Sequence, residues 1–426
     1  MSKIAVLGCG YAGLLVAIKA KRSDSSAEVL CIDRDFAGGL LRSVALNGFV
    51  FDVGGSHVVF SKRQEIVAGI LSLGGEWVRR ERLAYVYMDG GFIPYPFENG
   101  IYVLPAELRV RYGLSILKAL ISSSGERPRN LSEWIVNTFG EEVASDYLIP
   151  YNEKIWKRPL EQISADWAYI PGRLPLPSLE DIVKAIAGLP TVGYREQAVF
   201  YYPRKGGIVE QWRAAYRRAE ELGVKFLQME VREVKKVGSE FLINGVVKAD
   251  KVISTLPLRE APAIFGLSEE SFWATERLDY NSVIVVGVGL NSPAPKQHWI
   301  YVPDRRVPFH RYAWISNYGE DLPPNKSALI AEITVPPSEK VDVNALKHET
   351  VHWLAELGVI REEDIAVVVT WFHKYGYPIY TLSHSKDTQI IEGELRETGV
   401  ITFGRWGNWQ YWNTDKIYEK SMDLHL

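Results

Sequence analysis

The chain has 426 residues, which is too long for a single compact core and predicts two or three domains. Hydrophobic residues make up 47 % and charged residues 24 %, and 49 basic residues against 52 acidic ones leave a net charge of −3. This near-balance argues against a nucleic-acid binder that relies on a general positive field.

The number of cysteines and the lengths of the apolar runs further restrict the class of protein. Only two cysteines occur, Cys9 and Cys31, so we expect neither a disulfide framework nor a cysteine metal site. No apolar run reaches the ~18–20 residues that span a bilayer. Glycines interrupt the apolar segment 4–18, which could otherwise be mistaken for a signal peptide. We therefore expect a cytoplasmic protein with no transmembrane segment.

The predicted elements begin with a βαβ unit. Residues 3–8 form an apolar strand, residues 11–21 carry a helical pattern, and residues 28–33 form a second strand that ends in an acid. From about residue 104 to 150, apolar residues recur at three- and four-residue intervals, which predicts helices. Later β-branched runs predict strands of one antiparallel sheet. These runs begin at Asn281, Ser327 and Ile365.

A glycine pattern joins the first strand to the first helix. Gly8, Gly10 and Gly13 fit G-x-G-x-x-G, in which the glycines permit a tight turn, close approach of a pyrophosphate, and close packing of helix on strand. Asp33 lies twenty residues beyond Gly13 at the end of the second strand, where an acid would hold the hydroxyls of a ribose. Strand, turn, helix and acid in this order predict a dinucleotide site.

Two later glycine segments favour a flavin over a nicotinamide cofactor. Residues 38–43 (GGLLRS) and 51–57 (FDVGGSH) resemble the second glycine pair and the flavin-proximal loop of glutathione-reductase-type flavoproteins, which include amine oxidases and protoporphyrinogen oxidases. Residues 249–257 and Gly404-Arg405 resemble further segments of that group. The resemblance implies noncovalent FAD, with Arg42 near its phosphates and a short helix after Gly404 aimed at the flavin. The implied cofactor-binding residues are Gly8, Gly10, Gly13, Asp33, Gly39, Leu41, Arg42, Gly55, Ser56, His57, Arg405 and Asn413.

Five scattered motifs resemble those of the flavin-dependent UDP-galactopyranose mutases. They are Tyr151-Asn152-Glu153-Lys154-Ile155-Trp156 with Arg173 seventeen residues later, Trp299-Ile300-Tyr301 with Arg311 ten residues past Tyr301, Gly376-Tyr377-Pro378, residues 404–411, and Pro94-Tyr95-Pro96-Phe97. Asn152 matches the fungal and protozoal enzymes of that family. The resemblance implies that the substrate is held by Tyr95, Asn152, Trp156, Arg173, Trp299, Tyr301, Arg311, Tyr377 and Tyr411.

The same resemblance implies an isomerase that interconverts UDP-galactopyranose and UDP-galactofuranose. Reduced flavin N5 is the nucleophile at the anomeric carbon in that family. Arg173, on a mobile loop, and Arg311 would hold the diphosphate, because the guanidinium fork suits phosphate oxygens. His57 would lie against the flavin and change position with its redox state. Arg173, Arg311 and His57 are thus the implied catalytic residues, with NADPH or NADH as candidate reductants and a homo-oligomer left open.

The expected fold class is α/β, with a Rossmann-like FAD-binding domain of the glutathione-reductase type, a helical insertion domain and an antiparallel β-sheet domain. The FAD-binding domain is expected in three pieces, with the substrate domains inserted between them. The expected ranges are 1–90, 191–268 and 386–426 for the FAD-binding domain, 91–190 for the helical domain, and 269–385 for the sheet domain.

Two residues differ from the mutase motifs and leave a second function open. Glu98 stands where the fungal-type mutases carry Gln, and a carboxylate donates a hydrogen bond to a base only when it is protonated. Ser56, after the glycine pair, resembles the oxidase relatives. The alternative is therefore an FAD-dependent oxidase or dehydrogenase of the amine oxidase or protoporphyrinogen oxidase type. His310 and His373 have no metal-ligand spacing, so no metal is expected.

Overall fold

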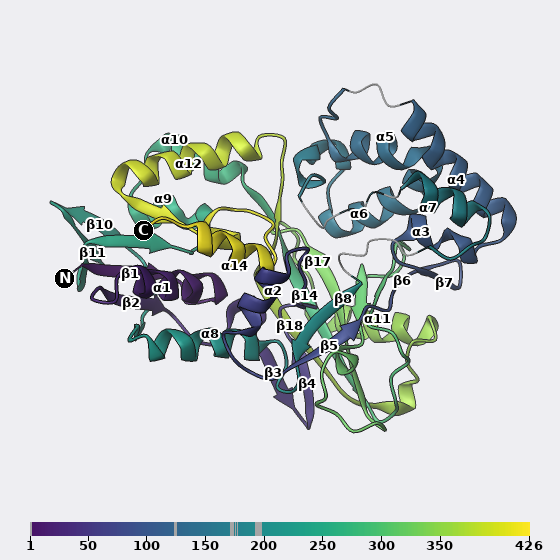
Figure 1. Cartoon of the computed structure of the whole chain (residues 1–426), viewed down its shortest axis with the longest axis horizontal. Helices are drawn as coiled ribbons and strands as arrows, with labels where there is room; N and C mark the ends of the chain where they lie inside the picture. The colour runs from purple at the N-terminus through teal and green to yellow at the C-terminus, as the bar shows by residue number, and fades with distance from the viewer. Residues whose placement is uncertain (1, 123–125, 171–173, 175, 177, 192–197) are drawn as a thin grey trace.

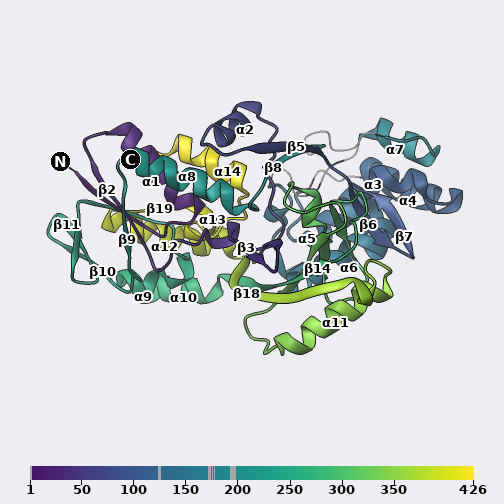
Figure 2. The same ribbon diagram turned by 90° about the horizontal axis from the view of Figure 1, so that it is seen from below.

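The computed structural model of the chain describes residues 2–122, 126–170, 174, 176, 178–191 and 198–426. Figure 1 shows a parallel sheet with its helices on the left, a group of helices at the upper right, and a large sheet below them. The view from below in Figure 2 places the N-terminal unit and the helical unit at opposite ends of the long axis. The two sheets and the helical group are described in turn below.

The N-terminal unit is built on a five-stranded sheet in the order β19-β13-β1-β2-β9, whose pairs are all parallel. The predicted βαβ unit is confirmed as β1 (Lys3–Leu7), α1 (Tyr11–Ser23) and β2 (Glu28–Asp33). β1 and β2 are apolar on both faces because helices cover both sides of a parallel sheet. The other strands are β9 (Lys225–Gln228), β13 (Lys251–Ser254) and β19 (Val400–Thr402).

Helices cover the two faces of this sheet as strand alternation requires. Val6 and Cys31 pack in one core with α1, and Leu7 and Ile32 pack in a second core on the opposite face. The helices that contact α1 are α8 (Val209–Glu221) and α14 (Thr414–Asp423), and α2 (Gln64–Leu71) packs on α14. The helices of the opposite face are α9 (Ala261–Phe265), α10 (Glu269–Arg277) and α12 (His384–Thr398), with a small sheet of β10 (Val234–Val237), β11 (Glu240–Ile243) and β12 (Val247–Ala249).

The large sheet has seven strands in the order β18-β14-β17-β16-β15-β6-β7. The three predicted strands are confirmed as β14 (Asp279–Leu290), β17 (Ser327–Val335) and β18 (Ile365–Ile379), which pair antiparallel. The sheet as a whole is mixed, because β15 runs parallel to β6. The remaining members are β6 (Ala84–Met88), β7 (Gly91–Pro94), β15 (Trp299–Tyr301) and β16 (Arg311–Ala313), and α11 (Val343–Glu356) packs on one face.

The helical group confirms the pattern predicted for residues 104–150. Its longest members are α4 (Ala106–Ile121) and α5 (Leu131–Val143), which share one apolar core that includes Ile116 and Ile135. The side chain of Asn130 caps α5 by accepting from the Glu133 N–H. The other members are α3 (Phe97–Gly100), α6 (Ile149–Trp156) and α7 (Leu179–Ile186). None of the described helices is long and apolar enough to cross a membrane.

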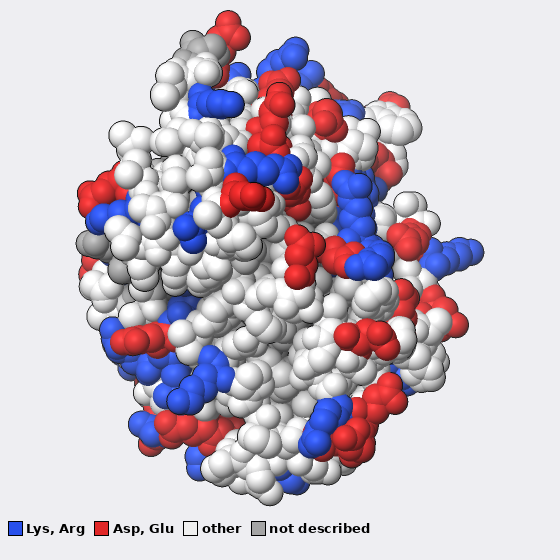
Figure 3. Space-filling view, turned by 90° about the vertical axis from the view of Figure 1, so that its right-hand side faces the viewer, with Lys and Arg blue, Asp and Glu red and all other residues white. Residues whose placement is uncertain are grey.

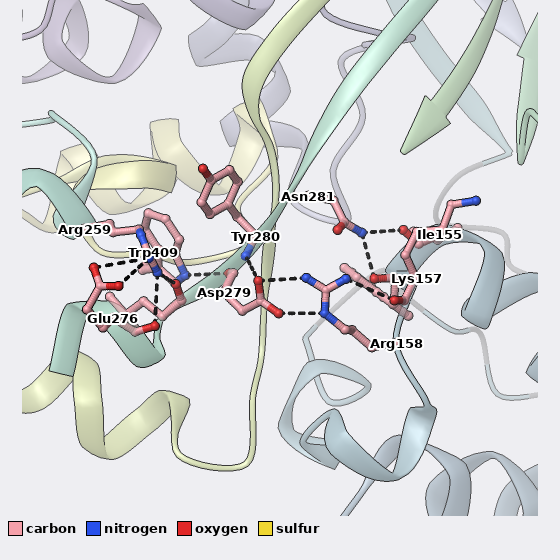
Figure 4. Close-up of polar contacts among 11 residues, drawn as sticks. Ile155, Lys157, Arg158, Arg259, Glu276, Asp279, Tyr280, Asn281 and Trp409 are labelled. Carbon is pink, nitrogen blue, oxygen red and sulfur yellow. Dashed lines mark hydrogen bonds and ion pairs between the residues drawn. The ribbon is translucent and has the colours of Figure 1, made fainter. Parts of the chain in front are cut away.

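A polar junction fixes the end of α6 to the start of β14 (Figure 4). The guanidinium of Arg158 donates two hydrogen bonds, of 2.9 and 3.0 Å, to the Asp279 carboxylate. Asn281 Nδ2 donates to the carbonyl oxygens of Ile155 and Trp156, each at 2.8 Å. These contacts hold the C-terminal end of α6 against the large sheet. We propose from this arrangement that residues 91–190 and 269–385 form two domains that meet beside the site.

Shorter hairpins complete the fold. They are the pair β3 (Ser43–Leu46) and β4 (Phe49–Asp52), and the pair β5 (Trp77–Glu81) and β8 (Val199–Pro203). Phe51 of β4 lies over Gly287 of β14, so a Cβ at Gly287 would lie 2.9 Å from the Phe51 ring. This contact brings the loop after β4, residues 53–57, against the large sheet.

Candidate active site

A cavity of 520 Å³ lies at the carboxyl ends of β1 and β2. This is the edge at which open α/β sheets bind their ligands. Of the predicted cofactor-binding residues, the cavity is lined by Gly8, Gly10, Asp33, Gly39, Leu41, His57, Arg405 and Asn413.

Gly13 and Gly10 of the first turn lack a side chain for two different steric reasons. A Cβ at Gly13 would lie 1.9 Å from the Gly8 carbonyl oxygen, so only glycine permits α1 to pack this closely on β1. A Cβ at Gly10 would meet nothing within 4 Å, so open space lies above the residue that precedes the first turn of α1. The N-terminus of α1 thus faces a space in which backbone N–H groups and the helix dipole favour a phosphate.

Asp33 lines the cavity, whereas Arg42 does not. The Asp33 carboxylate is turned toward the glycine turn and accepts from the Cys9 N–H at 2.6 Å. Burial raises its pKa, and the Cys9 N–H opposes that rise. Arg42 is exposed and does not line the cavity. Asp33 therefore braces the glycine turn in this structure, whereas the ribose and phosphate contacts of Asp33 and Arg42 remain predictions.

A second, aromatic cavity of 170 Å³ adjoins the first. Both cavities are bounded by His57, Arg405, Asn413 and Thr414, so they meet beside the N-terminus of α14. The predicted substrate residues that line the aromatic cavity are Tyr95, Trp299, Tyr301, Arg311, Tyr377 and Tyr411. Four of the five scattered motifs therefore contribute to one cavity wall, and the motif at residues 151–156 does not line it.

Two tyrosine pairs give the aromatic cavity flat surfaces. The rings of Tyr377 and Tyr411 stack with centroids 5.8 Å apart and an interplanar angle of 19°. The rings of Tyr95 and Tyr301 lie 4.8 Å apart. The Arg405 guanidinium lies 4.2 Å from the centroid of the Tyr411 ring. Such ring faces suit the apolar faces of a sugar or a base, while the hydroxyls can bond to polar groups.

Asn152 and Trp156 do not line the aromatic cavity. Asn152 is buried, and its side chain donates to the Leu148 carbonyl and accepts from Trp156 Nε1. The Trp156 ring packs edge-on against Tyr377 and Tyr411. Both residues therefore support the stacked tyrosine pair from behind, and direct substrate contacts by them remain a prediction from the resemblance.

A buried carboxylate that sequence reasoning missed lies at the centre of this cavity. Glu332 of β17 is 1 % exposed and pairs with the Arg311 guanidinium at 2.7 Å. It also accepts from the Tyr377 hydroxyl at 3.0 Å and from the Ser56 N–H at 2.9 Å. Burial raises the pKa of Glu332, but Arg311, His310 and the Ser56 N–H more than offset this rise and lower that pKa to about 2. One signal could have identified Glu332, because it is the lone acid in the apolar run 327–335.

Arg311 keeps hydrogen-bonding capacity for a ligand. The guanidinium bonds to Glu332 through Nη2, whereas its Nε is buried and has no partner among the described residues. A buried guanidinium nitrogen without an acceptor is costly, so its presence in a cavity wall is typical of a binding site. Arg173, the second predicted arginine, lies outside the described residues.

His57 lies where the two cavities meet. Its Nδ1 is 2.9 Å from the Gly55 carbonyl oxygen, and burial lowers its pKa to about 4. The ring is therefore neutral near pH 7, with Nδ1–H donating to Gly55 and Nε2 left as an acceptor. Ser56 bonds through its hydroxyl to Tyr318 at 2.7 Å. The 53–57 loop is thus held firmly, and it presents a neutral imidazole to the dinucleotide cavity.

Two further buried polar groups adjoin the site. His310, next to Arg311, is 3 % exposed, and its Nδ1 has no partner among the described residues. Lys154 Nζ donates to the carbonyl oxygens of Val302 and Asp304 at 2.8 and 2.7 Å, which ties α6 to the loop after β15. Neither role follows from residue spacing, because both depend on which loops the fold brings together.

The fold of this chain is similar to that of known dinucleotide-binding proteins. Residues 6–71 match the family described as an NAD(P)-binding Rossmann-like domain. A solved structure of reduced UDP-galactopyranose mutase is similar over 99 % of this chain and 92 % of that chain, with a TM-score of 0.88 and 24 % identity. The chain therefore has a Rossmann-like α/β fold, and the predicted resemblance to UDP-galactopyranose mutase is confirmed at the level of the fold.

Other solved structures share the fold less closely. A protein from Exiguobacterium sp. 255-15 assigned to the protoporphyrinogen oxidases covers 99 % of both chains, with a TM-score of 0.73 and 15 % identity. A putrescine oxidase variant is similar over 99 % of this chain and 98 % of its own, with a TM-score of 0.62 and 14 % identity. The fold is therefore common to a mutase and to oxidases, and the site has to decide the function.

Proposed function

We propose that the chain binds FAD noncovalently and, with the flavin reduced, interconverts UDP-galactopyranose and UDP-galactofuranose or a closely related nucleotide sugar. The observation that carries the proposal is the aromatic cavity, which adjoins the dinucleotide cavity and contains Arg311 among four tyrosines. A nucleotide sugar needs a cation for its diphosphate and flat surfaces for its rings, and this cavity offers both.

The residues of the first cavity fit FAD. Open space above Gly10 and the N-terminus of α1 suit a pyrophosphate. The ten-residue helix α14 begins between the two cavities at Asn413 and Thr414, where its dipole favours negative charge. Bound FAD would supply, in its reduced form, the nucleophilic nitrogen that attacks the anomeric carbon.

The side chains of the second cavity bind and orient the substrate. Arg311 would donate a hydrogen bond from Nε to a diphosphate oxygen while Glu332 holds its Nη2 side in place. The stacked pair Tyr377 and Tyr411 would flank the sugar, and Tyr95 with Tyr301 would flank the other end of the nucleotide. Retention of UDP by Arg311, and by Arg173 as the resemblance implies, would make its return to the sugar effectively intramolecular.

Glu98 is compatible with this proposal as a neutral acid. It is 3 % exposed, and burial raises its pKa to about 8 although Arg82 lowers it. A protonated carboxyl donates one hydrogen bond and accepts another, as the amide of Gln does. The side chain at this position can therefore present a donor near pH 7, which answers the objection that a carboxylate cannot.

An oxidase of the amine oxidase or protoporphyrinogen oxidase type is the second candidate. The Arg311–Glu332 ion pair favours the oxidase, because Glu332 neutralises the charge of Arg311 and reduces its attraction for a dianionic diphosphate. The two oxidase-like folds are the other support. An oxidase would consume oxygen and release one hydrogen peroxide per product, whereas the mutase reaction has no net redox change.

The test is turnover of UDP-galactofuranose by the purified FAD-loaded protein, followed by chromatography of the UDP-sugars. The proposal expects UDP-galactopyranose to form after dithionite or NADPH reduction and not with the oxidised protein. A candidate amine or porphyrinogen substrate oxidised with stoichiometric peroxide, and no conversion of UDP-sugar, would establish the oxidase instead.

A further inference from the structure

Asp52 ends β4 inside the 51–57 motif (FDVGGSH), and its side chain lines neither cavity. Acidic side chains are normally found at a protein surface, as are the red residues that lie among blue ones on the face shown in Figure 3. Asp52, in contrast, is 0 % exposed. A buried carboxylate is costly unless hydrogen bonds hold it, so the partners of Asp52 indicate what it positions.

The Asp52 carboxylate accepts hydrogen bonds from three separate segments. Its Oδ1 accepts from the Ser43 hydroxyl at 2.7 Å and from the Ile208 N–H at 3.0 Å, and its Oδ2 accepts from the Tyr202 hydroxyl at 2.7 Å. Burial raises the pKa of Asp52 to about 6 while these donors oppose the rise, so the carboxyl is ionised near pH 7. Hydrogen bonds to an ionised acceptor are stronger than those between neutral groups, so Asp52 holds the three segments firmly.

Two of the contacts at this site cap α8 from outside the helix. The N–H groups at the start of a helix have no partner within it, and Ile208, at the N-cap of α8, has no side-chain oxygen to accept from them. Asp52 accepts from the Ile208 N–H, and the Ser43 hydroxyl accepts from the Val209 N–H at 3.0 Å. A Cβ at Gly207 would lie 2.4 Å from Ser43 Oγ, so glycine is required for this close approach. The charge of Asp52 also suits the N-terminal end of a helix dipole.

Both flavin-like glycine segments join the open end of the β3–β4 hairpin, where Ser43 and Asp52 are paired. Segment 38–42 enters the hairpin before Ser43, and segment 53–57 leaves it after Asp52. The two segments touch, since a Cβ at Gly54 would lie 2.1 Å from a carbonyl oxygen of segment 38–42. Both segments line the dinucleotide cavity and the aromatic cavity. The anchor at Asp52 therefore fixes a wall that the two cavities share.

Helix α8 extends the same anchor to the first glycine turn. Trp212, in the first turn of α8, donates from Nε1 to the Cys9 carbonyl at 2.8 Å, and this contact is buried. Cys9 lies between Gly8 and Gly10, so α8 braces the turn that faces the space for a pyrophosphate. Because Asp52 fixes the start of α8, the position of this turn also depends on Asp52.

We propose that Asp52 is a positioning residue of the FAD site, which holds the first glycine turn, segment 38–42 and segment 53–57 in their binding arrangement from outside both cavities. The inference rests on the proposed FAD binding. A site whose walls come from three segments binds well only when they are held before the ligand arrives, because ordering them on binding costs free energy. Loss of the anchor should therefore weaken FAD binding even in a protein that still folds.

The experiment is titration of the FAD-free protein with FAD, followed by flavin fluorescence and by the visible spectrum of the bound flavin. Asp52→Ala should weaken FAD binding by about ten- to hundredfold, because three wall segments lose a shared anchor. Its bound flavin should have a spectrum closer to that of free FAD. Asp52→Asn should stay within about threefold of wild type, because the amide oxygen still accepts from Ser43 and Ile208 and the amide nitrogen can donate to Tyr202.

Asp342→Ala is the matched control, because Asp342 accepts from two backbone N–H groups at the start of α11 and lines neither cavity. It should lower stability and leave FAD affinity and the flavin spectrum unchanged. A folded Asp52→Ala protein with wild-type FAD affinity and spectrum would overturn the proposal. Equal weakening of FAD binding by Asp342→Ala would overturn it as well.

Ser43→Ala decides the question if Asp52→Ala does not fold. It removes the partner of the Val209 N–H and one of the three partners of Asp52, so FAD binding should weaken by about three- to tenfold. Unchanged FAD affinity in Ser43→Ala would then overturn the proposal. A wild-type protein that binds no FAD would overturn the proposed function together with this inference, whereas an FAD-binding protein indifferent to these substitutions would overturn the inference alone.

Discussion

The Glu332 carboxylate holds the Arg311 guanidinium at 2.7 Å in a buried ion pair at the centre of the aromatic cavity. The pair fixes the predicted diphosphate-binding residue before any ligand arrives. It also joins β16 and β17 of the large sheet to the 53–57 loop, because Glu332 accepts from the Ser56 N–H. One carboxylate thereby couples the position of the substrate arginine to the loop that borders the dinucleotide cavity.

Removal of Arg311 should affect stability and binding separately. Arg311→Ala leaves the Glu332 charge buried without its partner, so the free energy of unfolding should fall by about 3–5 kcal/mol. Adding Glu332→Gln should recover roughly 2 kcal/mol of that loss. UDP affinity should stay reduced by roughly ten- to hundredfold in both variants, because the phosphate donor is absent. Denaturant unfolding and UDP titration measure the two effects, and equal UDP affinity in all three proteins would refute the diphosphate role.

Gly10 and Gly13 should respond to alanine in opposite ways. Gly10→Ala should leave the stability of the FAD-free protein near that of wild type, because its Cβ meets no protein atom. Its FAD affinity should fall by about a hundredfold, which is roughly 2.7 kcal/mol, since the methyl group occupies the space of the pyrophosphate. Gly13→Ala should destabilise even the FAD-free protein by about 3 kcal/mol or more, because its Cβ meets the Gly8 carbonyl.

Flavin absorbance after gel filtration and thermal unfolding of the FAD-free proteins distinguish these two cases. Unchanged FAD retention in Gly10→Ala would mean that no pyrophosphate lies against this turn.

The free energy of unfolding should decrease as pH rises, because Glu98 is buried as a neutral acid. Its pKa is raised by burial from 4.5 to about 8 in the folded protein, so the folded state holds a proton that the unfolded state has released. This contribution is fully present below about pH 4.5 and is lost as pH rises to about 8. Glu98→Gln should therefore exceed wild type in unfolding free energy by roughly 4 kcal/mol at pH 8 and come close to it near pH 4.5.

Denaturant unfolding of wild type and Glu98→Gln at a series of pH values measures the difference in their unfolding free energies. Glu161→Gln, at an exposed glutamate, serves as the matched control and should show no such pH-dependent gain. A Glu98→Gln advantage that grows toward low pH would contradict the assignment of a neutral Glu98.

The junction in Figure 4 should stabilise α6 and, through it, the aromatic cavity. Asn281→Ala removes two buried hydrogen bonds to the C-terminal end of α6, so unfolding free energy should fall by about 2 kcal/mol. KM for the nucleotide sugar should rise, since Trp156 on α6 supports the stacked pair Tyr377 and Tyr411. Asn291→Ala, at an exposed position beyond the same strand, should change neither quantity. Equal effects of both substitutions would rule out a specific role for the junction.

The sequence predicted the elements and the cavity walls better than the polar contacts. Glycine spacing, strand and terminal acid predicted the βαβ unit because these signals are local and each has a steric cause. The motifs around Tyr95, Trp299, Tyr377 and Tyr411 were brought together by the fold, as the resemblance implied. These motifs lie together because related chains share one topology, so a resemblance in motifs predicts which residues share a site, whereas composition does not.

Contacts between distant residues were the part that could not be predicted. Glu332 has an ordinary strand environment in sequence, and only the pairing of β16 with β17 places it beside Arg311. Asn152 and Trp156 were expected at the substrate, yet the helical spacing of four residues lets them bond to each other behind the cavity. Residue type and spacing state what a side chain can do, whereas its partners follow from tertiary packing.

The most direct measurement is the number of product molecules formed per single reduction of the bound flavin. The FAD-loaded protein is reduced anaerobically with about one equivalent of dithionite, since the mutase chemistry needs reduced flavin but consumes no reductant. UDP-galactofuranose is then added in large excess, and UDP-galactopyranose is quantified against the flavin present. The proposed function predicts many product molecules per flavin, with the flavin still reduced when equilibrium is reached. One product or none per reduced flavin, with the flavin reoxidised by the substrate, would contradict it.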